Sequence, residues 1–191
     1  MPTPAERIIL GIDPGTTVLG YGVIRSRGKE VELLEVGVLQ LARITDHALK
    51  LKRIYDRCAA LIETHGPDHL AVEAPFFGKN VQSMLKLGRA QGVVMAAALA
   101  REVPIAEYAP RRVKQAITGS GAASKEQVAA MVARTLGLPL HDLPKEFDAT
   151  DGLAVALCHH FAASSPRMEK GAGGWKDFIA QHPGRVSGGG K

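Results

Sequence analysis

The sequence predicts an α/β fold in which a mixed β-sheet is flanked by helices. Two observations support this prediction. The first forty residues hold three strand-like segments joined by short turns, and from residue 48 onward helical and strand-like segments alternate. Short turns connect antiparallel strands, whereas alternation of helices and strands is typical of parallel pairing. We therefore expect three antiparallel strands followed by two parallel ones.

The first three segments have the composition of strands. They read IILGID (8–13), VLGYGVIR (18–25) and EVELLEVGVLQL (30–41). Turn residues follow the first, and the charged stretch RSRGK lies between the other two. Such short connections favour an antiparallel meander.

A helix and a fourth strand follow. The apolar residues between 48 and 64 recur at helical spacing, and the Gly66-Pro67 pair ends the pattern. The next segment, LAVEA (70–74), predicts a strand that ends close to Glu73.

A long helix is expected over residues 81–102. Small residues recur along it at every fourth position, which allows another backbone to approach closely: Gly88, Gly92, Ala96 and Ala100. The partner is either the sheet or a second subunit, and the sheet is slightly favoured.

The remaining elements are a strand, PIAEYA (104–109), and three helices. A short helix begins at Pro110, a second follows Ser124 with the pattern of a capping box, and the last covers residues 148–162. Residues 1–163 are expected to form one domain. Residues 164–191 are rich in Gly, Ser and basic residues and predict a flexible tail.

Composition and charge narrow the class of protein. Hydrophobic residues make up 46% of the 191, enough for a real core. No secretory signal or membrane span is recognisable, and the two cysteines lack metal-like spacing, so a cytoplasmic protein is expected.

The net charge is +6 over residues 74–125 and +3 over the tail. That distribution fits a polyanion partner, although a solvated helix surface would explain it equally well.

Two carboxylates stand at the ends of hydrophobic strands. Asp13 precedes a Pro-Gly turn, where aspartate is also common for purely local reasons. Glu73 is harder to explain, because an unpaired charge inside a strand costs several kcal/mol. If both strands are central and parallel, these acids meet at the edge of the sheet where α/β proteins bind ligands.

A second pair of acids opens the last helix. Asp148 and Asp151 could simply cap the helix, but residues three apart also share one helix face. Converging carboxylates repel one another, and hard divalent cations such as Mg²⁺ or Mn²⁺ relieve that repulsion. Two such ions about 4 Å apart can support phosphodiester hydrolysis. The sequence therefore predicts a metal-assisted nuclease with Asp13, Glu73, Asp148 and Asp151 as catalytic metal ligands.

Several motifs, in order, resemble the bacterial RuvC Holliday-junction resolvases. They are GIDPGTTVLGYGVI, VEAPFFGKN with LKLGRAQGV, RRVKQAITGSGAASKEQV, and DATDGLAVALCH. The resemblance implies a ribonuclease-H-like fold, a homodimer, a Mg²⁺ or Mn²⁺ requirement and symmetric nicking of two opposed strands of a four-way DNA junction. It also implies RuvA and RuvB as branch-migration partners and assigns the same four acids to catalysis.

The resemblance also implies DNA-binding residues. It places a junction-entering aromatic at Phe76, and the adjacent Phe77 leaves open which ring enters the DNA. It assigns DNA contacts to Lys114 and Lys125. The residues themselves agree, since aromatic rings stack on bases and a basic helix start meets phosphates. Lys79, Arg111 and Arg112 complete the expected DNA-binding set.

Two positions in the last helix carry separate expectations. Gly152 follows Asp151 where a better helix former is expected, which predicts a looser hold on that acid. His159, eight residues after Asp151, is expected to have a core or supporting role rather than a catalytic one.

Two other functions remain as alternatives. GIDPGTT is close to the first phosphate-binding hairpin of sugar kinases and actin-like ATPases, but those proteins need two domains and a second hairpin. A non-catalytic DNA-binding scaffold would explain the basic residues and leave the four acids without a role.

Overall fold

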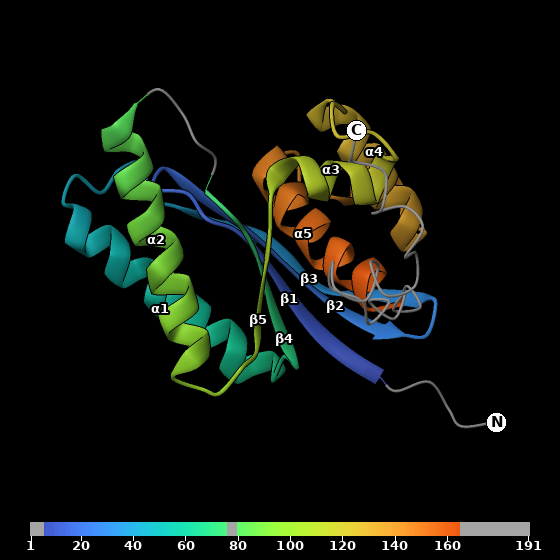
Figure 1. The fold of residues 1–191 in the computed structure, drawn as a ribbon, viewed down its shortest axis with the longest axis horizontal. Coiled ribbons are helices and arrows are strands. Elements are labelled where there is room, and N and C mark those ends of the chain that lie inside the picture. The colour runs from blue at the N-terminus through green and yellow to red at the C-terminus, as the bar shows by residue number, and fades with distance from the viewer. Residues whose placement is uncertain (1–5, 76–79, 165–191) are drawn as a thin grey trace, which may run out of the picture.

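A five-stranded mixed sheet forms the centre of the molecule (Figure 1). The computed structural model describes residues 6–75 and 80–164. The strands lie in the order β3-β2-β1-β4-β5. Their bounds are β1 Glu6–Asp13, β2 Val18–Arg27, β3 Glu30–Gln40, β4 His69–Glu73 and β5 Ile105–Tyr108.

Helices cover both faces of the sheet. Figure 1 shows α1 and α2 on one face and α3, α4 and α5 on the other. Their bounds are α1 His47–His65, α2 Val81–Leu99, α3 Pro110–Thr118, α4 Lys125–Leu136 and α5 Phe147–Ser164, with a short 3₁₀ helix at Leu140–Asp142. The expected α/β class and the order of the elements are confirmed, and none of the helices described is long and apolar enough to cross a bilayer.

The pairing of β1 sets the geometry of the sheet. It runs antiparallel to β2, with Asp13 opposite Gly20, and parallel to β4, with Ile12 opposite Val72. Because β1 and β4 are parallel neighbours in register, their last residues, Asp13 and Glu73, reach the same edge of the sheet.

The two faces of the sheet bury separate apolar cores. Alternate residues of β1 point to opposite sides, so Leu10 and Ile12 pack under α1 and α2, while Ile9 packs under the other helices. All three side chains are almost completely buried. Burial at this level stabilises a fold by roughly 1.5–3 kcal/mol for each large aliphatic side chain.

Helix α5 packs unusually close to β1 and β2. Added Cβ atoms at Gly11 and Gly20 would lie closer than 3.0 Å to the backbone of the helix, and one at Gly152 would meet the backbone of β2 in the same way. The expectation that Gly152 loosens the hold on Asp151 is therefore wrong. Its missing side chain is what lets the helix start lie directly on the sheet.

The small residues of α2 do not face the sheet. Gly88 and Gly92 are exposed, and added Cβ atoms there would meet nothing within 4 Å. Ala96 and Ala100 are exposed as well, whereas the helix packs on the sheet through a different side that includes Ala90 and Val94. The expectation that the small residues bring the helix onto the sheet is wrong, and the alternative of a second subunit remains.

The ends of the helices follow the local sequence signals. Ser124 and Gln127 form the expected capping box of α4. Gly66 and Gly137 end α1 and α4 in the left-handed conformation that glycine adopts most easily. Helix α2 stops at Leu99, three residues before its expected end. The boundary expected at residue 164 stays a prediction, because residues 165–191 lie outside the described part.

Candidate metal centre and nucleic-acid site

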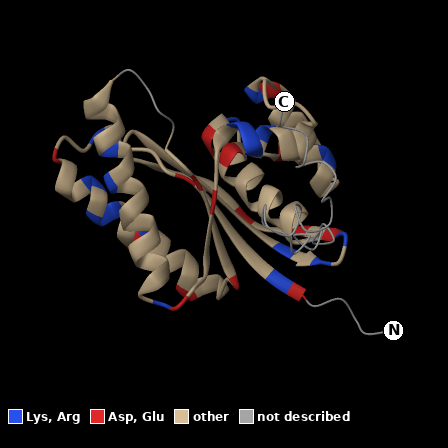
Figure 2. Ribbon diagram, viewed as in Figure 1, with Lys and Arg blue, Asp and Glu red and all other residues tan. Residues whose placement is uncertain are grey.

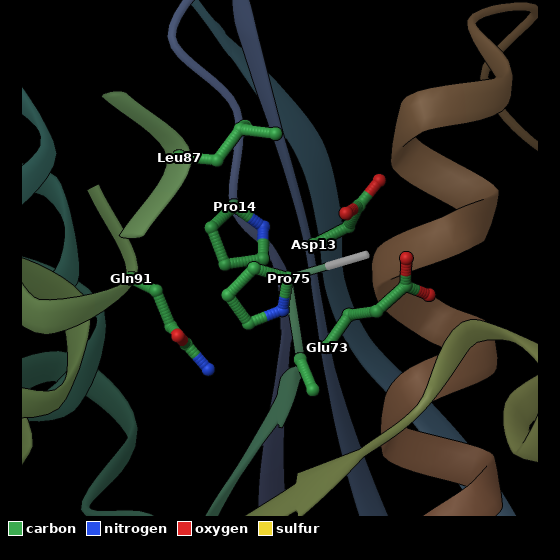
Figure 3. Close-up of a pocket in the computed structure, with 7 residues that line it drawn as sticks. Asp13, Pro14, Glu73, Pro75, Leu87 and Gln91 are labelled. Atoms are coloured by element: carbon green, nitrogen blue, oxygen red, sulfur yellow. The ribbon is translucent and has the colours of Figure 1, made fainter. Parts of the chain in front are cut away.

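Asp13 and Glu73 lie side by side at the carboxyl edge of the sheet. Asp13 is the last residue of β1 and Glu73 the last residue of β4. Both side chains are half-buried. In Figure 3 their carboxylates point in the same direction, toward α5. The sequence-based expectation that the two acids meet at one edge is confirmed.

Helix α5 brings two further acids to this edge. Asp148 and Asp151 lie in its first turns, and the contact of Gly20 with the Asp148 backbone holds that end of the helix over β2. The helix begins at Phe147, so Asp148 is inside the helix rather than at its N-cap. A simple capping role does not account for it.

Three of the four acids form a compact cluster. Carboxylate oxygens of Asp13, Asp148 and Asp151 lie within 4.8 Å of one another, and all three residues are half-buried. An all-oxygen donor set of this kind suits a hard divalent cation. Glu73 does not belong to that set, but it lines the same two cavities as Asp13.

The electrostatics of the site favour a cation. Burial, then repulsion from Asp151, raises the pKa of Asp13 to about 7. Burial, then the charges of Asp13 and Asp151, raises the pKa of Glu73 to about 8. Near neutral pH the two carboxyls therefore retain protons for part of the time, and a bound cation would replace those protons.

A lysine already contacts one of the acids. The Lys125 ammonium at the start of α4 donates a hydrogen bond to Asp151 Oδ2 at 2.6 Å. Burial lowers the pKa of the Lys125 ammonium, but the hydrogen bond to Asp151 and the negative charges of Asp151, Asp148 and Asp13 together outweigh burial and raise that pKa. One positive charge thus offsets part of the negative charge in this arrangement.

Asp13 and Glu73 line two cavities. The larger, about 280 Å³, is lined by Asp13, Glu73, Asp151, Lys114 and Lys125, together with apolar residues of α3, α4 and α5. The smaller, about 110 Å³, lies on the α2 side. Figure 3 shows Leu87 and Gln91 of α2 across this space from Glu73, with Pro14 and Pro75 between them.

The predicted basic residues of α3 and α4 fall into two groups. Lys114 and Lys125 line the larger cavity with the acids. Arg111 and Arg112 are exposed on α3 and do not line either cavity beside the acids. Figure 2 shows basic residues on α3 next to the acidic start of α5. Phe76, Phe77 and Lys79 lie outside the described residues.

Sequence analysis missed two hydrogen bonds beside Glu73. Gln91 of α2 is 8% exposed and donates to Glu107 of β5 at 2.7 Å. On the opposite face of β5, the Tyr108 hydroxyl is 2.8 Å from His159 Nδ1. Both bonds join residues from separate elements, so no local pattern in the sequence marks them.

Comparisons with known proteins identify the family of the chain. The family model described as crossover junction endodeoxyribonuclease RuvC matches residues 9–159. The crossover junction endodeoxyribonuclease RuvC of Bacteroides fragilis is 60% identical over 95% of this chain and 96% of its own length.

Solved structures show the same similarity. Thermus thermophilus RuvC is 38% identical, with a TM-score of 0.73 over 82% of this chain and 95% of that one. A second structure, T. thermophilus RuvC in complex with a Holliday junction substrate, is 36% identical, with a TM-score of 0.76 over 83% and 95%. The family model spans residues 9–159, and a curated relative is 60% identical over 95% of the chain. The chain therefore belongs to the RuvC family of crossover junction endodeoxyribonucleases.

Proposed function

We propose that this protein is a metal-dependent endonuclease that resolves Holliday junctions by nicking two opposed DNA strands symmetrically, in recombination and repair. The observation that carries the proposal is the cluster of Asp13, Asp148 and Asp151, with oxygens within 4.8 Å of one another. Membership of the RuvC family supplies the substrate class, because one relative of 36% identity was solved in complex with a Holliday junction substrate.

The four acids would hold the metal. Asp13 offers an oxygen ligand from the end of β1, Asp148 and Asp151 offer theirs from the start of α5, and Glu73 adds a fourth carboxylate from the neighbouring strand end. Mg²⁺, with Mn²⁺ as a substitute, fits such a donor set, and two ions per site would balance four carboxylates. When bound, the metal supplies Lewis-acid stabilisation of the charge that develops on phosphodiester hydrolysis.

The chain's own cations would bind the phosphates. Lys114 and Lys125 share the larger cavity with the acids, so a phosphate entering it meets positive charge on its α3 and α4 side. Arg111 and Arg112 extend that charge over the exposed surface of α3. Phe76 and Phe77 are proposed to contact the bases of the junction, and Lys79 its backbone.

A homodimer would place two such sites on one junction. The exposed side of α2 has the character of a subunit interface, because Val81, Leu85 and Leu99 are 65%, 51% and 64% exposed. Gly88 and Gly92 lie on that same side and leave room for a second backbone. A second copy packed there would bury apolar side chains that otherwise face water.

The remaining elements of the proposal follow from the family. RuvA and RuvB are the expected partners in branch migration, and the bacterial cytoplasm is the expected location. Neither bears on the chemistry of the acid cluster.

Substrate structure provides the first test. A synthetic immobile four-way junction and linear duplexes with the sequences of its arms are incubated with the protein and Mg²⁺, using several junction core sequences. Symmetric paired nicks in the junction, with the duplexes left intact, are the expected result. Equal cutting of both substrates would refute junction specificity.

A further inference from the structure

His159 connects α5 to β4, the strand that carries Glu73, and to the neighbouring strand β5. It is 8% exposed, and its Nδ1 lies 2.8 Å from the hydroxyl of Tyr108, the last residue of β5. Its ring also packs against His69, the first residue of β4, with centroids 4.8 Å apart. One side chain of α5 thus contacts both β4 and β5.

Tyr108 in turn holds the end of β4. It is paired with Glu73 in the parallel ladder, and its carbonyl accepts the backbone N–H of Ala74 at 2.9 Å. The residues on both sides of that peptide bond are therefore fixed to the end of β5. Any shift of Tyr108 would carry the Glu73 backbone with it.

Strand β5 depends on side chains for its own position. It has four residues and lies at the edge of the sheet, so within residues 6–75 and 80–164 it has a strand neighbour on one side only. Tyr108 is bonded to His159 on one face, and Glu107 accepts from Gln91 of α2 on the other. These two bonds fasten the strand between the helices that cover the sheet.

The same helix carries the other acids. His159 follows Asp151 by eight residues, a distance of about 12 Å along an α-helix. Gly20 and Gly152 fix the start of α5 on β2, and His159 fixes its later turns on β4 and β5. Burial, then the nearby charges of His69 and Arg7, lowers the pKa of His159 to about 4, so the ring is neutral at neutral pH.

We infer that Tyr108 and His159 are positioning residues. Their hydrogen bond holds Glu73 in its position relative to Asp148 and Asp151. The inference rests on the proposed role of these acids as metal ligands. Neither side chain lines the cavities that the acids share. Their effect on the metal would therefore act through Glu73 and α5.

The structure offers a matched control for a test. His160, the next residue of α5, makes an equivalent bond, with its Nδ1 2.7 Å from the Ser26 hydroxyl on β2. Tyr108→Phe and Ser26→Ala each remove one hydroxyl from a histidine Nδ1 on the same helix. Only the first of these bonds lies beside a strand end that carries a proposed metal ligand.

The experiment measures Mn²⁺ binding by titration calorimetry, melting temperature without metal, and the rate of junction nicking. Both variants should lower the melting temperature, but only Tyr108→Phe should weaken Mn²⁺ binding, by roughly tenfold. His159→Asn places an amide oxygen near the former Nδ1 and should bind Mn²⁺ better than His159→Leu does.

The results separate positioning from general packing. The inference is overturned if Tyr108→Phe weakens Mn²⁺ binding no more than Ser26→Ala does, or if His159→Asn and His159→Leu bind the metal equally. Because Mn²⁺ binding is measured without DNA, this outcome is distinct from failure of the proposed function, which would appear as a wild-type protein that does not nick junctions.

Discussion

The backbone carbonyl of Asp148 lies directly over Gly20, so close that a Cβ added to Gly20 would be within 3.0 Å of it. Gly20 is paired with Asp13 across β1 and β2. The glycine beside one acid therefore allows the helix that carries two others to approach. Metal-site geometry and packing of the sheet against α5 are linked at this one position.

Gly20→Ala should separate Asp148 from Asp13. The added methyl group meets backbone rather than a movable side chain, so the helix start must shift, at a cost of about 3 kcal/mol in unfolding free energy. Thermal unfolding and Mn²⁺ calorimetry should both show losses. Gly37→Ala is the control, because its methyl meets the Tyr21 hydroxyl instead of α5. Normal metal binding by a folded Gly20→Ala protein would argue against the link.

The raised pKa values of Asp13 and Glu73 predict how metal-free stability depends on pH. In the folded state the pKa values of these groups are about 7 and about 8, compared with 3.8 and 4.5 for the free side chains. Between these values the folded protein keeps protons that the unfolded chain has released. Their contribution to stability is therefore fully present below about pH 4 and is lost as the pH rises through 7 and 8.

Asp13→Asn should remove much of this pH dependence. An amide cannot ionise, so at pH 8 the metal-free variant should be more stable than the wild type, by on the order of 2 kcal/mol. Melting curves from pH 5 to 8.5 in the presence of a chelator provide the measurement. In a separate series without chelator, added Mg²⁺ should strongly stabilise only the wild type. Parallel curves for the two proteins at every pH would show that Asp13 is not the titrating group.

Lys125→Met should affect metal binding and catalysis in opposite directions. The ammonium competes with a cation for Asp151, so its loss should lower the half-saturating Mn²⁺ concentration, by roughly fivefold. Cleavage should slow, because the larger cavity loses a charge that would face the phosphate. Lys114→Met, in the same cavity, should slow cleavage but tighten metal binding less, because the charge of Lys114 affects Glu73 less than that of Lys125 does. A higher Mn²⁺ requirement in Lys125→Met would mean that the lysine supports the metal site instead.

Gly92→Glu should convert the proposed dimer into a monomer. The position is exposed and open, so a glutamate fits the isolated subunit and even favours the helix, whereas it would place charge in a subunit interface. Sedimentation velocity measures the outcome. Ala60→Glu on the exposed side of α1 controls for the added charge. A Gly92→Glu protein that remains dimeric would place the interface elsewhere.

The strand-end acids were predictable because the signal is local. A hydrophobic run that ends in an acid marks both Asp13 and Glu73. Their meeting depended on the condition that the two strands are central and parallel, which the pairing of β1 with β4 satisfies. Asp148 and Asp151 were predictable from their three-residue spacing at the start of a helix. Their distance from Asp13 was not, because it depends on Gly11, Gly20 and Gly152.

The predictions from sequence were wrong at glycines whose packing partner the local sequence does not identify. Small residues suit a close contact, but Gly88 and Gly92 do not reveal whether the partner is the sheet or another subunit, and the structure excludes the sheet. Gly152 weakens an isolated helix yet fits this one tightly against β2. Pairs such as Lys125 with Asp151 and Tyr108 with His159 join distant elements and required the fold.

The most direct test of the central claim is cleavage of a labelled four-way junction by wild type, Asp13→Asn and Glu73→Gln, each with and without Mg²⁺. Binding is measured in parallel by gel mobility. We predict paired nicks from the wild type only with metal, and no nicks from either variant although both still bind the junction. Cleavage near the wild-type rate by either variant, or by the wild type after chelation of all metal, would contradict a metal centre built on these strand-end acids.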